Sequence, residues 1–201
     1  MKINPLVSII IVNWNGKEVL GQCLDSLEKL KYQNWELILV DNGSVDGSEN
    51  LVENFNLKYK SYHLIKNSKN LGFAFANNQG LKKAGGKYIL LLNNDTKVKA
   101  DFLIKLVDWM KNRPTVGVIQ PKILVMDKKG YLDNAGTFLT RIGFLEHWGY
   151  MKKDSDEFNK EREIFSTKGA CMLCRKKVID KVGLFDSDFF NYYEESDFCW
   201  R

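Results

Sequence analysis

Residues Lys87–Val98 read KYILLLNNDTKV, and the rest of the chain can be organised around this stretch. The apolar run Tyr88–Leu92 predicts a short strand buried on both faces. Asn93, Asn94 and Asp95 follow it directly. Parallel strands of an open α/β sheet place ligands just beyond their carboxyl ends, and a carboxylate there suits a hard divalent cation that holds a diphosphate. These residue types also favour turns, so an ordinary turn is the alternative interpretation.

Length and charge narrow the class of protein. The 201 residues are 44% hydrophobic, and no linker rich in Pro, Gly or Ser divides them, so we expect one domain over residues 1–201. The net charge is +5, with Lys and Arg scattered along the chain. Nucleic-acid binding would require a basic stripe, which scattered charges do not form, so we expect no nucleic-acid partner. A diffuse positive charge suits an anionic small molecule or peripheral membrane association, with ordinary solvated lysines as the alternative.

Targeting signals and cysteines indicate the compartment. The apolar run Leu6–Val12 is too short for a signal-peptide core or a membrane span, and no other run is longer. The cysteines are Cys23, Cys171, Cys174 and Cys199. A single CxxC without a second pair argues against a zinc site. Because no export signal is visible, we expect four reduced thiols in a cytoplasmic protein, which could lie at the inner face of the membrane. Because the chain stops at Arg201 in mid-pattern, we expect a truncated C-terminus.

Apolar runs alternate with amphipathic stretches in the first half of the chain. The expected strands are Leu6–Val12, Glu36–Val40, His63–Lys66 and Tyr88–Leu92. The expected helices cover Lys17–Leu30, residues 44–55, part of Asn67–Gly80, and Asp101–Asn112. This alternation predicts an α/β fold, with a parallel sheet and right-handed crossovers.

The second half of the chain is less regular. The expected strands are Val116–Gln120, Ile123–Val125 and Ser166–Leu173, and the expected helices cover Arg175–Val182 and a segment starting near Glu194. Leu132–Gly143 is ambiguous, and Glu146–Glu163 is expected to be a mobile loop. Four aromatic residues are assigned to the core rather than to sugar-stacking platforms: Trp14, Tyr192, Tyr193 and Trp200.

Polar clusters end three of the predicted strands. They are Asn13 with Asn15, Asp41–Ser48, and Asn93–Asp95. In a doubly wound sheet these strand ends converge on one crevice. Asp41 could accept hydrogen bonds from a base N–H or from ribose hydroxyls, and Asp95 could hold a metal ion. The acids Glu194, Glu195 and Asp197 could supply a general base for an acceptor hydroxyl.

Six segments, in this order, resemble the inverting family-two glycosyltransferases of the GT-A fold, and best the branch that includes rhamnosyltransferase-like enzymes. The segments are VSIIIVNWNG, ELILVDNGSVDGS, NLGFAFANNQG, LLNNDTKV, GACMLCRKKVIDKVGLFD and YYEESDFCWR. The resemblance implies a Rossmann-like, mostly parallel sheet flanked by helices. It also implies a nucleotide-diphosphate sugar donor, Mg²⁺ or Mn²⁺, and a glycan or lipid-linked acceptor in polysaccharide or cell-surface glycan synthesis.

The resemblance also implies roles for individual residues. Those matching the nucleotide-sugar site are Val12, Asn13, Asn15, Asp41, Asp46, Asn70, Gly72, Asn77, Asn93 and Asn94. Within this set, Asp41 matches the aspartate that reads the base. Asp95 completes the DxD-type metal motif. Glu195 matches the catalytic base and is preceded by Glu194.

Two positions depart from the family pattern. Asn93 replaces the first aspartate of the metal motif, so the cation should lean on the donor phosphates, as magnesium commonly does. Glu195 stands where an aspartate is usual and is longer by one methylene. Because a displacement of about 1 Å in a catalytic group can be costly, Asp197 remains an alternative base.

Two other functions are alternatives to sugar transfer. A sugar nucleotidyltransferase would be expected to carry a glycine-rich, basic loop after the first strand, but NWNGKE stands there with one glycine. A non-catalytic nucleotide-sugar-binding module is the alternative that Asn93, Glu195 and the early stop support.

Overall fold

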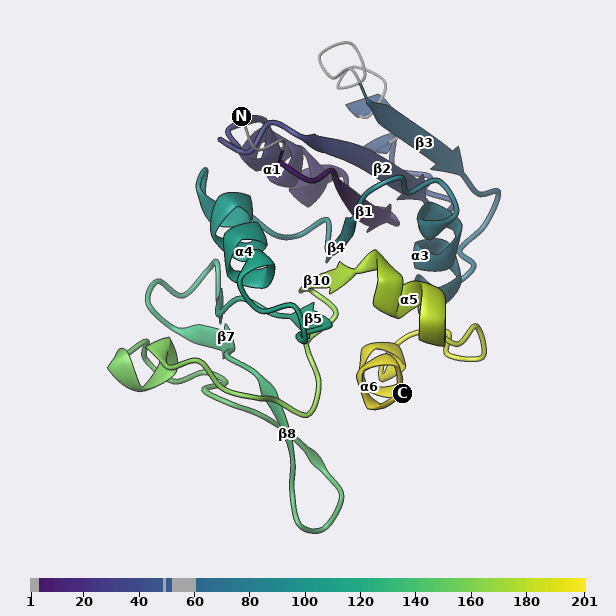
Figure 1. The fold of residues 1–201 in the computed structure, drawn as a ribbon. Coiled ribbons are helices and arrows are strands. Elements are labelled where there is room, and N and C mark those ends of the chain that lie inside the picture. Colours follow the sequence, from purple (N-terminus) through teal and green to yellow (C-terminus); the bar gives the residue numbers. More distant parts are fainter. Residues whose placement is uncertain (1–3, 49, 52–60) are drawn as a thin grey trace.

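A six-stranded sheet forms the centre of the computed structural model, which describes residues 4–48, 50–51 and 61–201 (Figure 1). The strand order is β3-β2-β1-β4-β10-β5. The strands are β1 (Val7–Asn13), β2 (Trp35–Asp41), β3 (Tyr62–Lys66), β4 (Tyr88–Leu92), β5 (Val118–Ile119) and β10 (Cys171–Arg175). The first four are parallel, whereas β10 runs antiparallel to β4 and β5. The predicted mostly parallel α/β sheet is confirmed.

Helices cover both faces of this sheet. They are α1 (Lys17–Glu28), α3 (Phe73–Leu81), α4 (Phe102–Lys111), α5 (Lys176–Val182) and α6 (Glu194–Trp200). Side chains alternate along each strand, so Ile9 and Ile11 pack with α1 and α4 while Ile10 packs on the opposite face with α3, α5 and α6. Of the helix expected over residues 44–55, residues 49 and 52–55 lie outside the described part of the chain.

The antiparallel strand β10 differs from the expected strand at Ser166–Leu173. It begins at Cys171 and ends at Arg175, so the prediction was wrong at both ends. Arg175 is 7% exposed, and its guanidinium donates hydrogen bonds to the backbone carbonyls of Val116 (2.6 Å), Met110 (2.5 Å) and Arg113 (2.8 Å). Met110 lies in the last turn of α4 and the other two residues follow the helix, so the buried cation links the end of β10 to the end of α4.

Residues 123–166 form two small sheets beside the main one. Their strands are β6 (Ile123–Leu124), β7 (Leu132–Asn134), β8 (Thr137–Leu139) and β9 (Leu145–His147). The prediction of a loop over Glu146–Glu163 was wrong in part, because this range holds the end of β9 and the 3₁₀ helix Asp156–Asn159. Phe158 is buried there with its ring 5.0 Å from that of Trp148, and aromatic packing of this kind fixes a segment that lacks periodic apolar residues.

All four cysteines are free thiols, as expected. In the described ranges, no helix is both long enough and apolar enough to cross a bilayer.

Candidate functional site

The carboxyl ends of β1, β2 and β4 meet at the buried side chain of Asn13. Its Nδ2 donates hydrogen bonds to Asp41 Oδ1 (3.2 Å), Ser44 Oγ (3.2 Å) and Ser48 Oγ (2.9 Å). Its Oδ1 accepts a hydrogen bond from Asn94 Nδ2 (2.8 Å). One asparagine therefore joins the three predicted polar clusters into a single polar floor at the edge of the sheet.

The loop after β2 is held by its own polar residues. The Asp41 carboxylate, 4% exposed, accepts hydrogen bonds from the backbone N–H (3.2 Å) and Oγ (2.6 Å) of Ser44. Asp46 accepts hydrogen bonds from Ser48 Oγ (2.5 Å) and from the backbone N–H of Lys17 (2.8 Å), and these bonds lower its pKa. Asn15 Oδ1 accepts a hydrogen bond from the Val45 backbone N–H (2.9 Å). The predicted site residues Asp46 and Asn15 thus shape the loop that carries the site.

Asn42 is a second polar centre, to which the sequence pattern assigned no individual role. Its buried side chain donates to Asn70 Oδ1 (2.9 Å) and accepts hydrogen bonds from the Leu71 N–H (3.1 Å) and Asn67 Nδ2 (3.0 Å). Asn42 therefore fastens the segment before α3 to the end of β2. Its position directly after Asp41 was the available signal, but a turn residue has the same signature.

Three further predicted binding residues lie around α3 and β1. Gly72 has φ 90°, which suits glycine, and its N–H donates to Asn70 Oδ1 (2.9 Å). Asn77 is buried, and its Nδ2 donates to the Phe73 carbonyl within α3 (2.9 Å). Val12, half-buried, is the last residue of β1 before Asn13. Asn70 and Gly72 thus lie together, whereas Asn77 is bonded within its own helix.

The residues after β4 fit a cation that receives only part of its ligands from protein. Asp95 is exposed, and the Asn93 Oδ1 is buried with no hydrogen-bond partner. Among the described residues, no cluster of three or more His, Cys, Asp or Glu side chains could hold a metal ion. One carboxylate with a nearby amide oxygen suits Mg²⁺ or Mn²⁺ when phosphates and water complete the shell.

The two glutamates at the start of α6 occupy a largely desolvated position. Glu194 is 3% exposed; burial raises its pKa from 4.5 to about 7, and its Oε2 has no hydrogen-bond partner. Burial also raises the pKa of Glu195, while a hydrogen bond from the Gly169 N–H opposes this rise. Before them, Tyr192 and Tyr193 adopt φ values of 72° and 69°, a left-handed backbone that is costly for such residues.

Asp197, the alternative base, lies one turn along the same helix. Its carboxylate accepts a hydrogen bond from Arg201 Nε (2.8 Å) and forms an i,i+4 ion pair with that residue. Arg201 also donates to the carbonyls of Val182 and Leu184. Asp197 is therefore engaged in positioning the end of α6.

The turn before β10 connects the glutamates to the end of β4. The Asn93 N–H donates to the Ala170 carbonyl (2.9 Å), and the neighbouring Gly169 contacts Glu195. A Cβ added at Gly169 would lie 3.9 Å from both Glu194 Oε1 and Glu195 Cδ. The acids and the candidate metal motif, about a hundred residues apart in sequence, thus lie on either side of one turn.

The aromatic residues assigned to the core are exposed instead, so that prediction was wrong. The exposed fractions are 54% for Trp14, 73% for Tyr192, 63% for Tyr193 and 73% for Trp200. All four lie outside the regular strands of the core, in the turn after β1 or around α6, where periodicity gives no information on burial. Trp14 stands directly after Asn13, beside the polar floor.

Comparison with known families agrees with this geometry. The model of the family described as "Glycosyl transferase family 2" matches residues 8–183. The chain belongs to glycosyl transferase family 2. Poly-beta-1,6-N-acetyl-D-glucosamine synthase of Staphylococcus epidermidis is 24% identical over 210 aligned residues, which cover 96% of this chain and 49% of that protein.

Solved structures of glycosyltransferases share the fold. The Pyrobaculum calidifontis mannosyltransferase PcManGT, in complex with GDP-Man and Mn²⁺, matches with a TM-score of 0.71 at 17% identity, covering 98% of this chain and 51% of that one. Staphylococcus aureus TarS 1-349, in complex with UDP-GlcNAc, matches at 0.73 and 18%, covering 96% and 52%. The predicted GT-A fold is confirmed, and this chain spans about half the length of these proteins.

Proposed function

We propose that this family 2 chain transfers a sugar from a nucleotide-diphosphate sugar to an acceptor hydroxyl with inversion, in the synthesis of a polysaccharide or cell-surface glycan. The observation that carries the proposal is the turn at Gly169 and Ala170. In it Glu195 accepts a hydrogen bond from the Gly169 N–H, and the next residue, Ala170, accepts one from the Asn93 N–H at the end of β4. A general base and a diphosphate-binding end would then lie on either side of the reacting anomeric carbon.

The donor nucleotide would lie over the polar floor. Asp41 would accept hydrogen bonds from the base edge or ribose, held in place by Asn13 and Ser44. The exposed Trp14 ring offers an apolar surface beside the same floor, on which a flat base could stack. Asn70 and Gly72 would approach the ribose and diphosphate from the start of α3.

The chemical step needs a base and a stabilised leaving group. A bound Mg²⁺ or Mn²⁺, held through Asp95 and the donor phosphates, would neutralise the departing diphosphate. Glu195 would take the proton of the acceptor hydroxyl as that oxygen bonds the anomeric carbon and the bond to the diphosphate oxygen breaks. The raised pKa makes the Glu195 carboxylate a stronger base than an exposed one. Attack from the face opposite the diphosphate inverts the anomeric centre.

The finer parts of the proposal concern donor, acceptor and location. The donor would be a hexose or rhamnose nucleotide, and the rhamnosyltransferase-like branch is the first choice. Metal dependence is supported by Asp95 at the end of β4 and by the Mn²⁺ in the PcManGT complex. The acceptor would be a glycan or a lipid-linked glycan at the inner face of the membrane, consistent with four reduced cysteines. Residues 1–201 would act as one catalytic domain.

Donor hydrolysis tests the proposal without knowledge of the acceptor. The chain is incubated with a panel of nucleotide sugars and Mg²⁺ or Mn²⁺, and release of the nucleoside diphosphate and the anomer of the sugar product are followed by NMR. We expect release with one donor class and an inverted product. Asp95→Asn should weaken the metal-dependent affinity for the nucleoside diphosphate in calorimetry, because it removes the proposed carboxylate ligand. It should leave the fold intact, because the side chain is exposed.

Two results would contradict the proposal. Tight donor binding without turnover, in a protein extended to the length of its relatives, would favour the non-catalytic binding module. Equal diphosphate affinity of Asp95→Asn and the parent chain would remove Asp95 as a ligand.

A further inference from the structure

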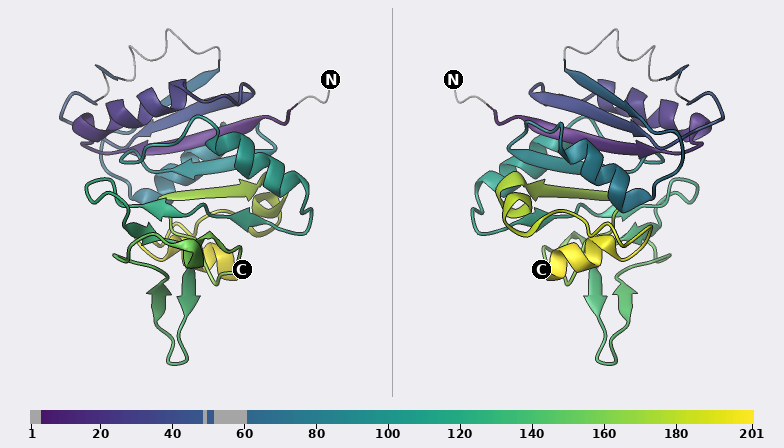
Figure 2. Two further views of the ribbon diagram at one scale, coloured as in Figure 1. Left: turned by 90° about the vertical axis from the view of Figure 1, so that its left-hand side faces the viewer. Right: turned by 90° about the vertical axis from the view of Figure 1, so that its right-hand side faces the viewer.

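The β8–β9 hairpin projects from the body of the protein, away from the main sheet (Figures 1 and 2). Its antiparallel pairs are Thr137 with His147, Phe138 with Glu146, and Leu139 with Leu145. None of the residues of the proposed donor site lies in this hairpin.

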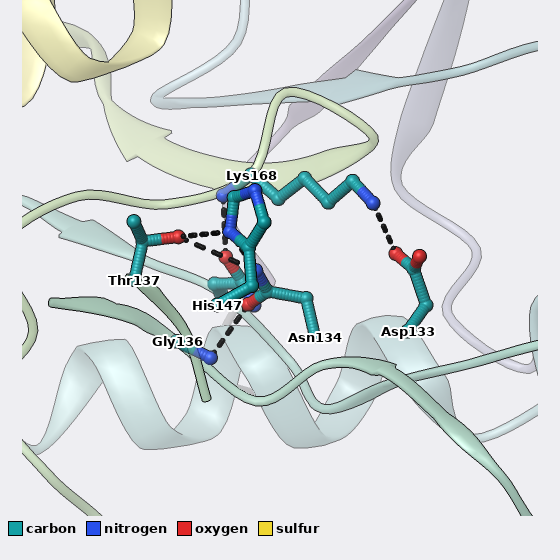
Figure 3. Close-up of polar contacts among 7 residues, drawn as sticks. Asp133, Asn134, Gly136, Thr137, His147 and Lys168 are labelled. Atoms are coloured by element: carbon teal, nitrogen blue, oxygen red, sulfur yellow. Dashed lines mark hydrogen bonds and ion pairs between the residues drawn. The ribbon is translucent and has the colours of Figure 1, made fainter. Parts of the chain in front are cut away.

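The base of the hairpin is fixed by a buried asparagine, Asn134 (Figure 3). Its Nδ2 contacts both Thr137 Oγ1 (3.3 Å) and His147 Nδ1 (2.8 Å), the paired residues of the first rung. Its Oδ1 accepts hydrogen bonds from the Gly136 N–H (2.6 Å) and Gln120 Nε2 (2.8 Å). Because Asn134 Nδ2 can only donate, His147 Nδ1 is the acceptor. The hairpin is therefore held at a defined angle to the body.

The tip is a closed turn. The Thr140 N–H donates to the Phe144 carbonyl (2.8 Å), and the Thr140 carbonyl accepts a hydrogen bond from the Gly143 N–H (3.0 Å). Thr140 Oγ1 also accepts a hydrogen bond from the Phe144 N–H (2.9 Å). Gly143 takes φ 86°, the left-handed position that three-residue hairpin loops require. The tip thus presents its side chains in a preformed arrangement.

Large apolar side chains cover this tip. Ile142 is 80% exposed, Phe144 is 69% exposed and Leu139 is 47% exposed. Residues 134–145 contain no acid, and the cation among them, Arg141, is exposed within the turn. Apolar side chains ordered at a projecting point, with a cation beside them, are unfavourable in water unless something covers them.

We infer that the hairpin tip inserts into an anionic lipid surface. Stable protein interfaces bury roughly 800 Å² on each partner, far more than a convex turn of five residues can offer. A bilayer accepts a small apolar wedge, and Ile142 and Phe144 would enter the region between headgroups and acyl chains. Arg141 would remain at the level of the lipid phosphates, where each cation near the surface adds about 1 kcal/mol of attraction. The inference holds whether or not the proposed transfer reaction is correct.

Vesicle cosedimentation tests this inference. The chain is mixed with vesicles of phosphatidylcholine alone or with phosphatidylglycerol, and the bound fraction is measured against lipid concentration. We expect binding to the anionic vesicles, weakened on the order of tenfold to a hundredfold by the double change Ile142→Ser with Phe144→Ser. Arg141→Gln should weaken it about fivefold and reduce the preference for anionic lipid.

A matched control removes two exposed apolar side chains elsewhere. Leu124 and Met126 are 42% and 48% exposed near β6, and changing both to Ser should leave lipid binding unchanged. Thermal melting by circular dichroism checks that every variant folds. The inference is overturned if the parent chain binds neither vesicle, or if the control loses as much binding as the tip variant. It is also overturned if light scattering shows that the tip holds two copies together in the absence of lipid.

Discussion

The parallel half of the molecule, β1 to β4, differs from the later half, β5 onward, in the length of most strands and in the exposure of apolar side chains. The parallel strands have five to seven residues, and those of β4 are all buried. In the later half, β5 to β9 have two or three residues each, and large apolar side chains such as Ile142 reach solvent. Long buried strands would suit the proposed donor site, whereas short strands and turns can bring residues distant in sequence, such as Glu195, to the edge of the sheet.

The sharpest test of this division is Glu195→Gln. If the later half supplies the chemistry, turnover should fall by about 10²- to 10⁴-fold, the usual contribution of a general base, while donor affinity stays unchanged. Donor hydrolysis and calorimetry measure the two separately. Asp197→Asn is the control, because Asp197 bonds Arg201 and should act through the position of α6. An active Glu195→Gln variant beside a folded, inactive Asp197→Asn variant would reverse the assignment.

Stability should differ between the halves as strongly as architecture does. Leu90→Ala, in the fully buried β4, should lower the free energy of unfolding by about 2–5 kcal/mol because it leaves a cavity. Leu139→Ala, on the half-exposed hairpin, should change it by no more than about 0.5 kcal/mol. Urea denaturation measures both. Equal losses would show that the hairpin belongs to the same cooperative core as the sheet.

Asp41→Ala tests the parallel half for donor binding. Nucleoside diphosphate affinity should fall by about 1–3 kcal/mol, the cost of leaving a buried hydrogen-bonding group without its partner. The turnover of bound donor should be less affected, in contrast to Glu195→Gln. Ser44→Ala is the matched control, because it removes one of the bonds to Asp41 but keeps the carboxylate. An unchanged dissociation constant for Asp41→Ala would rule out its contact with the base or ribose.

The buried Glu194 carboxyl should also give the stability a pH dependence. Its pKa is about 7 in the folded chain and 4.5 without burial, so the folded state retains a proton that the unfolded state has lost. The free energy of unfolding should therefore be highest below pH 4.5 on account of this group, and should fall as the pH rises to about 7. Glu194→Gln should flatten that slope in denaturation curves recorded across this range. An unchanged slope would mean that Glu194 is solvated.

The parallel half was predictable because its signals are local. Tyr88–Leu92 is the strand that the sequence indicated, and Lys17 begins the helix that apolar spacing predicted. The start of β10 was placed too early because Thr167 is a β-branched residue of the kind that favours strands, whereas in the structure it lies buried in an irregular segment. The ordered structure within Glu146–Glu163 was not predicted, because it depends on the packing of Phe158 with Trp148, and the sequence periodicity does not indicate this contact.

The residues of the candidate site were easier to predict from the sequence than the hydrogen bonds that connect them. Strand ends correctly placed Asn13, Asp41 and Asn94 together, since parallel strands finish at one edge of the sheet. The role of Asn42 could not be read from the sequence, because it depends on the distant Asn70. The catalytic and binding roles themselves stay predictions, as does the single domain.

Arg175 helps to fix the position of the turn at the opposite end of β10. Five residue pairs, from Arg175 with Tyr88 to Cys171 with Leu92, set the register of β10 against β4, and the guanidinium of Arg175 fixes one end of this register. A slip of two rungs would keep every β10 side chain on its own face of the sheet, yet it would carry Gly169 about 7 Å from its present place beside Glu195. The contacts of Arg175 with the backbone around the end of α4 thus help to determine where Gly169 lies relative to Glu195, the proposed base.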